Sequence, residues 1–181
     1  MDASDYPAIA DRFGAVVDSV NDWDAPTPVP EWRARDIVDH LTTWLPGLLG
    51  SCGVEIPMGT LDDPVGSWRT QDAALRSLLA DRGGETITHE FLGTKSIAEI
   101  VAQVYLGDVF MHTWDLARSA GVDDGLDPAV CEEMVTGMEQ MEDMLRNSGH
   151  YGPRFPGDPG PDPVRRLMAF VGRDPNWSNR A

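Results

Sequence analysis

The stretch GDVFMHTWD, residues 107–115, carries the polar side chains on which the fold and the chemistry of this chain depend. Asp108 and His112 stand four residues apart, so on a helix they lie on one face, one turn from each other. Upstream, the same face carries the apolar residues Ile97, Val101 and Val104. Two side chains able to bind a metal therefore share a stripe that points into a core, where buried polar groups need partners.

The rest of the chain reads as helices separated by proline and glycine. The apolar periodicity predicts helices over residues 4–20, 35–49, 65–81, 96–120, 128–149 and 163–171. Residues 85–95 give only a weak indication of an extended segment. Four long helices with little strand signal predict an all-α fold, in which a bundle core can hold a metal site built from facing helices.

Local signals define several helix ends. Ser96 followed by Glu99 is a capping-box pattern that opens the helix carrying Asp108, and Gly121 ends it. Pro46 falls inside the second helix and is expected to kink or shorten its last turn. At 181 residues the chain is expected to form one domain with a short appendage. We place the bundle at residues 1–150, and a C-terminal loop and short helix packed on it at residues 151–181.

The composition excludes several classes of partner. The net charge of −16 opposes binding to nucleic acid and to anionic membranes, because phosphate groups repel such a surface. No segment approaches 18 uninterrupted apolar residues, and the first residues lack the basic and apolar pattern of a signal peptide. The two cysteines, Cys52 and Cys131, do not form a metal-type pair. We therefore expect a cytoplasmic protein with reduced thiols.

A second motif, DIVDHL at residues 36–41, supplies a further candidate ligand, His40, on the second helix. His40, Asp108 and His112 together would offer two imidazoles and one carboxylate. Such a set with open coordination positions suits catalytic zinc, and it also suits non-haem iron. The alternative is that each histidine is simply packed or solvated. The metal interpretation predicts that the two helices are adjacent, with their imidazoles within about 6 Å of each other.

Four residues near His40 and His112 each allow a functional and a structural interpretation. Asp36 and Asp115 could orient an imidazole, although Asp36 is better explained as a helix-start carboxylate. Trp44 and Trp114 could wall a pocket, although core packing is the usual role of a tryptophan at helical spacing. The sequence contains no phosphate-binding loop, nucleophile elbow or CxxC motif. No catalytic acid, base or nucleophile is therefore assigned, and metal-centred chemistry is the best enzymatic interpretation.

Three stretches resemble a known family. These are VDHL at residues 38–41, which follows Trp32, then DVFMHTWDLA at residues 108–117, and RLMAFVGRDP at residues 166–175. The first two resemble the metal-binding domain of mycothiol-dependent maleylpyruvate isomerases, part of the DinB-like superfamily of four-helix metalloproteins. The third looks typical of a small actinobacterial branch of that group.

The resemblance implies a DinB-like four-helix bundle with additional C-terminal helices. It also implies a divalent metal, usually Zn²⁺ with Fe²⁺ or Ni²⁺ as alternatives, held by His40, Asp108 and His112. Asp108 stands where the isomerase carries Glu, and its shorter arm leaves direct or water-mediated ligation open. Mycothiol is implied loosely as a cosubstrate. Maleylpyruvate is not carried over, because the isomerase has a further C-terminal domain that helps to bind substrate.

Three functions follow as hypotheses. The first is a zinc-dependent transferase or isomerase that activates a low-molecular-weight thiol of the mycothiol type toward a small-molecule electrophile. The second is a metal-binding or sensing bundle without catalytic activity. The third is a structural bundle whose polar residues only bond to one another. The predicted partners are small molecules, with a homodimer as an open alternative.

Overall fold

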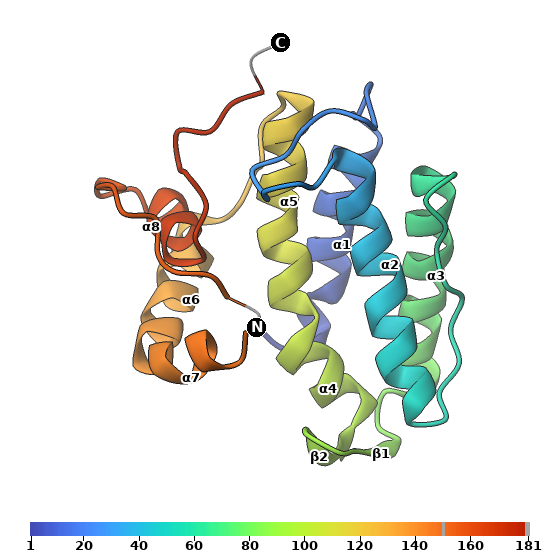
Figure 1. Cartoon of the computed structure of the whole chain (residues 1–181). Helices are drawn as coiled ribbons and strands as arrows, with labels where there is room; N and C mark the ends of the chain where they lie inside the picture. The colour runs from blue at the N-terminus through green and yellow to red at the C-terminus, as the bar shows by residue number, and fades with distance from the viewer. Residues whose placement is uncertain (150, 180–181) are drawn as a thin grey trace.

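The computed structural model describes residues 1–149 and 151–179 and is mostly helical (Figure 1). After a single 3-10 turn at Ala3–Asp5, the helices are α1 (Tyr6–Val17), α2 (Ala34–Ser51), α3 (Pro64–Arg82), α4 (Ile97–Val104), α5 (Leu106–Ala120), α6 (Pro128–Gln140), α7 (Glu142–Asn147) and α8 (Pro163–Phe170). Between α3 and α4, strands β1 (Thr86–His89) and β2 (Gly93–Ser96) pair as an antiparallel hairpin. The mainly helical prediction is confirmed, and the weak extended signal over 85–95 corresponds to this hairpin.

Four helical rods form a bundle. Helices α1 and α2 each pack against both α3 and α5, and α4 leads into α5, so α4 and α5 together make the fourth rod. The core between the rods consists of buried apolar side chains, among them Phe13, Leu41, Leu75 and Val109. The predicted adjacency of the helices that carry His40 and His112 is confirmed, because α2 and α5 are in contact.

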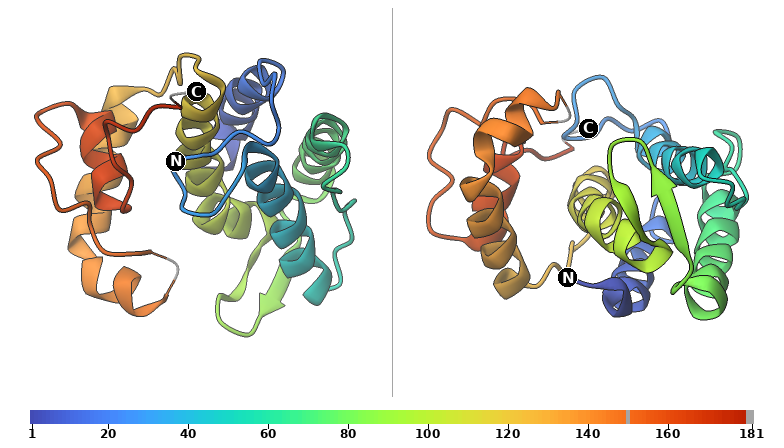
Figure 2. Two further views of the ribbon diagram at one scale, coloured as in Figure 1. Left: turned by 45° about the horizontal axis from the view of Figure 1, so that its top comes forward. Right: turned by 90° about the horizontal axis from the view of Figure 1, so that it is seen from below.

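The C-terminal helices form a second group beside α5. Helix α6 packs mainly on α8, and Figure 2 shows α6, α7 and α8 gathered on one side of α5. A second apolar cluster joins this group to the bundle, with Phe110, Met111 and Trp114 of α5 packed against Cys131 and Leu167. The domain boundary expected at residue 150 lies outside the described residues and stays a prediction.

Two predicted helices are interrupted. The helix expected over 96–120 breaks at Tyr105, and the one expected over 128–149 breaks at Met141. Tyr105 is fully buried, donates its hydroxyl to the carbonyl of Leu41 at 3.1 Å and accepts from Nε2 of Gln71 at 2.7 Å. Periodicity along one helix does not reveal such a cross-bundle network. This network ties the chain to α2 and α3 three residues before Asp108.

Pro46 does not end α2, which continues to Ser51, so the expected shortening is wrong. A proline inside a helix lacks the N–H that would bond to the carbonyl four residues earlier. Here that carbonyl belongs to Thr42, and it accepts instead from the N–H of Gly59 at 2.9 Å. The loop after α2 therefore satisfies the group that Pro46 leaves open.

We expect Tyr105→Phe to lower the free energy of unfolding by about 1–2 kcal/mol, because a buried hydroxyl with two hydrogen bonds is lost. Urea denaturation measures this change. Tyr6→Phe is the comparison: Tyr6 is equally buried, but its hydroxyl lies beside Asp72 and takes no part in the network with Leu41 and Gln71. Equal destabilisation by the two substitutions would contradict a stabilising role for the Tyr105 network.

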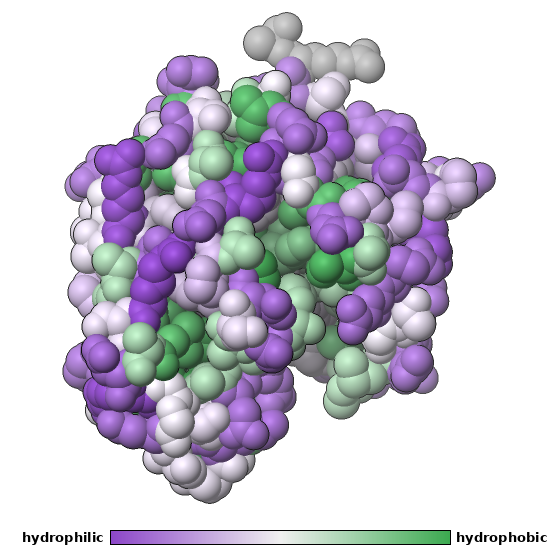
Figure 3. Space-filling model, turned by 180° about the vertical axis from the view of Figure 1, so that it is seen from behind, coloured by the Kyte–Doolittle hydropathy of each residue, from purple (hydrophilic) through white to green (hydrophobic). Residues whose placement is uncertain are grey.

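The surface of the molecule is largely hydrophilic when it is seen from behind, and a notch lined partly by hydrophobic side chains separates two lobes (Figure 3). Over the described residues, none of the helices combines the length and the apolar character needed to cross a lipid bilayer.

Candidate metal centre

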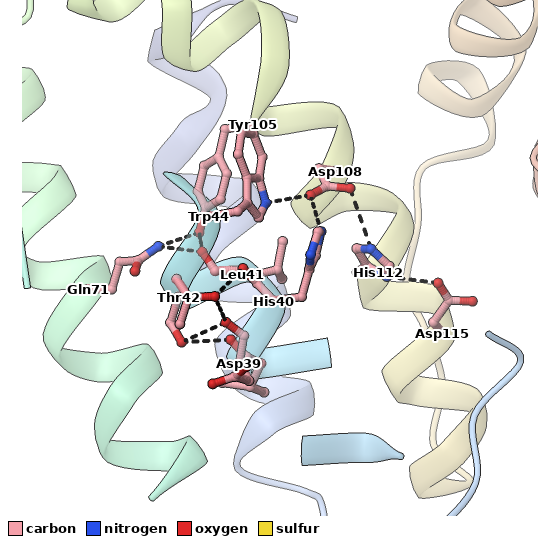
Figure 4. A network of polar contacts seen from close by, with 12 residues as sticks. Asp39, His40, Leu41, Thr42, Trp44, Gln71, Tyr105, Asp108, His112 and Asp115 are labelled. Atoms are coloured by element: carbon pink, nitrogen blue, oxygen red, sulfur yellow. Dashed lines mark hydrogen bonds and ion pairs between the residues drawn. The ribbon is translucent and has the colours of Figure 1, made fainter. Parts of the chain in front are cut away.

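The loop before α2 positions both His40 and the ring of Trp32 that lies beside it. The backbone N–H and the hydroxyl of Thr27 both donate to the carbonyl of Trp32, at 3.1 and 3.0 Å. Asp36 accepts from the backbone N–H of Arg33 at 2.7 Å, so its carboxylate caps the start of α2. The helix-start interpretation of Asp36 is therefore confirmed. With this start, His40 falls almost two turns into α2, on the side that meets α5 (Figure 4).

His40, Asp108 and His112 come together between α2 and α5, with the carboxylate of Asp108 between the two imidazoles (Figure 4). Nε2 of His40 donates to Oδ2 of Asp108 at 3.0 Å, and Nε2 of His112 lies 3.5 Å from Oδ1. The two ring centroids are 5.2 Å apart, so the predicted approach of the imidazoles is confirmed. One potential ligand atom from each residue lies within 4.8 Å of the others.

The cluster is open on the side of His40. The side chains of His40 and Asp108 are 32% and 23% exposed, whereas that of His112 is 7% exposed. Burial would raise the pKa of Asp108, but the hydrogen bond from His40, the nearby imidazoles and the indole N–H of Trp44 outweigh it. The pKa of Asp108 therefore lies below its ordinary value, and the group is a carboxylate at neutral pH.

A buried carboxylate holds His112 from the other side of its ring. Nδ1 of His112 lies 2.9 Å from Oδ2 of Asp115, which is completely buried. Arg173 in turn donates two hydrogen bonds to Asp115, from Nε at 3.1 Å and from Nη2 at 2.9 Å. Burial opposes ionisation of Asp115, but Arg173 and His112 together keep its pKa below the ordinary value. The ionised carboxylate can only accept, so Nδ1 of His112 carries the proton.

This tautomer turns the lone pair of Nε2 of His112 toward Oδ1 of Asp108. Two acceptor atoms facing each other at 3.5 Å repel unless a cation or a proton lies between them. Donors held at about 2.1 Å by one tetrahedral zinc ion are about 3.4 Å apart. The spacings of 3.0 and 3.5 Å run from the two imidazoles to different oxygens of Asp108. All three donors lie within 4.8 Å of one another, so a shared ion would draw them slightly closer together. The donor set therefore fits a divalent cation, with the proton of a neutral His40 moving from Nε2 to Nδ1 so that Nε2 is free to bind.

Two tryptophans flank the cluster. Trp32 stacks on His112 with centroids 5.6 Å apart and an angle of 17° between the rings, and it lies 5.1 Å from His40. Trp44 donates its indole N–H to Oδ2 of Asp108 at 3.0 Å. Tyr151, from the C-terminal part of the chain, packs against the second apolar cluster, and burial together with the charge of Asp108 raises its pKa.

Most of the predicted site residues lie at the cluster, but Trp114 does not. His40, Asp108 and His112 meet, Asp115 holds His112, and Trp44 contacts Asp108. Trp114 lies in the apolar cluster between α5 and the C-terminal helices, and the recorded ring contacts of the two imidazoles come from Trp32 and Trp44. Sequence reasoning gave no role to Trp32, Arg173 or Tyr151. Trp32 precedes the motif at residues 38–41 and Arg173 lies within the motif at residues 166–175, and this position was the available sequence signal for both.

The fold and the cluster together define a class: a helix-bundle protein with a His-Asp-His cluster between two of its rods. A sequence model described as the mycothiol maleylpyruvate isomerase N-terminal domain matches residues 6–52. That match includes α1, α2 and His40, whereas Asp108 and His112 lie beyond it. The resemblance to this family is thereby confirmed in the N-terminal part of the chain.

Similarity to individual proteins extends further along the chain. Two uncharacterized proteins of Mycobacterium tuberculosis, from strains CDC 1551 / Oshkosh and H37Rv, are each 28% identical to it over 182 residues. Each alignment covers 90% of this chain and 92% of the relative. No solved structure matches the chain significantly.

Proposed function

We propose that the chain is a DinB-like metalloprotein that binds one divalent metal, with zinc preferred, through His40, Asp108 and His112. We further propose that it uses this centre to activate a low-molecular-weight thiol, of the mycothiol type, for transfer to or isomerisation of a small electrophile. The observation that carries the proposal is the convergence of three donors from α2 and α5, with Nδ1 of His112 held by Asp115 and Nε2 of His112 facing Asp108.

Each residue around the centre has a defined task in this proposal. His40 and His112 supply neutral nitrogens from two different helices. Asp108 supplies a carboxylate whose orientation the indole N–H of Trp44 holds. A divalent metal bound there would act as a Lewis acid and lower the pKa of a thiol in contact with it. Trp32 and Trp44 limit the access of water on two sides of the cluster, which strengthens electrostatic effects within it.

The exposed side of the cluster suits a ligand that enters from solvent. Three protein ligands leave a tetrahedral metal with one open position, as in catalytic zinc sites. The partial exposure of His40 and Asp108 puts that opening on the solvent side of α2. The match to the mycothiol maleylpyruvate isomerase N-terminal domain supports mycothiol as the thiol.

The test combines metal analysis with a thiol assay. We expect purified protein to contain one equivalent of divalent metal, to bind a small thiol only when the metal is present, and to conjugate that thiol to a model electrophile until a chelator removes the metal. Stoichiometric metal without thiol binding would favour the metal-binding or sensing domain. Protein that neither contains nor takes up metal would favour the structural bundle, in which the bond from His40 to Asp108 only stabilises the fold.

A further inference from the structure

Arg173 is a residue from outside the bundle that contacts the carboxylate holding His112. It lies beyond the end of α8, yet its guanidinium contacts Asp115, a residue of α5 that is completely buried. We infer that Arg173 is a positioning residue: through Asp115 it fixes the orientation and the tautomer of His112, and so sets the affinity of the cluster for metal. This inference rests on the proposed metal site, but part of its test needs no metal.

The backbone of Arg173 is held by the way in which α8 ends. Gly172 adopts a left-handed conformation with φ of 90°, and its N–H donates to the carbonyl of Ala169 at 3.1 Å. The N–H of Arg173 then donates to the carbonyl of Met168 at 2.9 Å, which completes a Schellman motif. A side chain at position 172 would meet the carbonyl oxygen of Pro153 at 2.8 Å. The motif therefore gives Arg173 a fixed starting point on the C-terminal group of helices.

The side chain of Arg173 is equally constrained. Its Nε and Nη2 atoms donate to the two oxygens of Asp115 as a fork, and Nη1 donates to the carbonyl of Val171 at 3.2 Å. Oδ2 of Asp115 accepts from both Arg173 and Nδ1 of His112. A two-point contact determines the plane of the carboxylate, and that plane determines the direction of the bond to His112. The order of contacts is therefore Arg173, Asp115, His112 and then Asp108.

Two effects of Arg173 on metal binding have opposite signs. Its positive charge repels a divalent cation, so charge alone predicts that removing Arg173 would strengthen metal binding. Its fork orients Asp115, so orientation predicts that removing it would weaken metal binding. Partners that orient a ligating histidine typically change metal affinity by 10–100-fold. Asp115 screens the charge of Arg173 from the cluster, and we therefore expect orientation to dominate.

Two substitutions at position 173 separate these effects. Arg173→Gln removes both the charge and the fork, and Arg173→Lys keeps the charge but cannot form the fork. We expect the metal dissociation constant, measured by competition with a chelating dye, to rise about 10-fold for Gln. For Lys we expect a rise of about threefold, because one hydrogen bond and the charge remain. Arg166→Gln is the matched control, since it removes an ion pair with Glu132 within the same group of helices and should leave metal affinity unchanged.

A double-mutant cycle tests whether Arg173 acts through Asp115. Asp115→Asn also weakens the orientation of His112, so adding Arg173→Gln to it should change the dissociation constant by less than about twofold. Folding of every variant is checked by circular dichroism and thermal unfolding. A separate measurement on metal-free protein follows the side-chain ¹⁵N signals of the histidines. The wild type should show His112 as the Nδ1–H tautomer, and Arg173→Gln should show a mixture of tautomers.

The outcomes distinguish this inference from the proposed function. Tighter metal binding by Arg173→Gln with unchanged binding by Arg173→Lys would mean that charge dominates, and would overturn the inference. Unchanged affinity in both variants, or full additivity with Asp115→Asn, would also overturn it while leaving the metal site intact. If the wild type binds no metal, the proposed function fails, and the tautomer measurement then decides whether Arg173 still positions His112.

Discussion

Replacing His112 with Ala should abolish metal binding while the bundle remains folded. His112 supplies Nε2 to the proposed centre, and the loss of one of three protein ligands should raise the metal dissociation constant by more than about 100-fold, beyond the range seen for residues that only orient ligands. Asp115 keeps its ion pair with Arg173 in this variant, so no buried carboxylate is left unpaired. Any thiol transfer that depends on the metal should disappear with it.

The loss of the metal can also be measured as lost stabilisation. Zinc at about 100 times its dissociation constant should stabilise the wild type by about 2.7 kcal/mol and should not stabilise His112→Ala. His89→Ala is the matched control, because His89 lies in the hairpin, away from the cluster, and should respond to zinc as the wild type does. Equal stabilisation of His112→Ala and the wild type by zinc would show that the cluster is not the binding site.

Trp114→Ala should have the largest effect on the fold. Trp114 is 1% exposed and joins α5 to the cluster of apolar side chains from α6 and α8. Replacing such a buried tryptophan with Ala leaves a cavity and should lower the free energy of unfolding by about 3–5 kcal/mol. Trp114→Phe should cost less, because the indole N–H has no hydrogen-bond partner among the described residues and only part of the ring is lost. Guanidinium denaturation measures both changes.

The same variants test whether Trp114 walls the metal pocket. If its role is packing, Trp114→Phe should bind metal and thiol as the wild type does. Phe91→Ala serves as the control for stability, because Phe91 is 84% exposed and its loss should change the free energy of unfolding by less than about 0.5 kcal/mol. A Trp114→Phe protein of unchanged stability that no longer binds thiol would favour the pocket-wall interpretation instead.

Spacing along the chain, together with the family resemblance of the two motifs, predicted the three members of the cluster. Asp108 and His112 lie one turn apart on an apolar stripe, and His40 lies on a second such stripe. Because each stripe must face the core, two helices of one bundle bring these side chains together with few alternatives. Asp36 was also interpretable from sequence, since a carboxylate in the first turn of a helix commonly caps it.

The breaks in the helices could not be predicted in the same way. Periodicity runs through Tyr105, but the chain breaks there, where a hydroxyl is bound by groups from α2 and α3. Pro46 shows the converse, because a sequence signal for shortening is overruled when Gly59 supplies the missing donor. In both cases the residue makes or leaves open a hydrogen bond to a partner far away in the chain, about which local propensity carries no information.

By itself, the sequence determined the helical character of the protein, the two apolar stripes and the three candidate ligands, because these depend on periods of three and four residues within single helices. Only the tertiary structure decided what surrounds them: that Trp32 rather than Trp114 stacks on His112, and that Arg173 reaches Asp115. Asp115 and Arg173 are 58 residues apart and meet because the C-terminal helices pack beside α5. Such a contact depends on how whole elements pack, which no local pattern records.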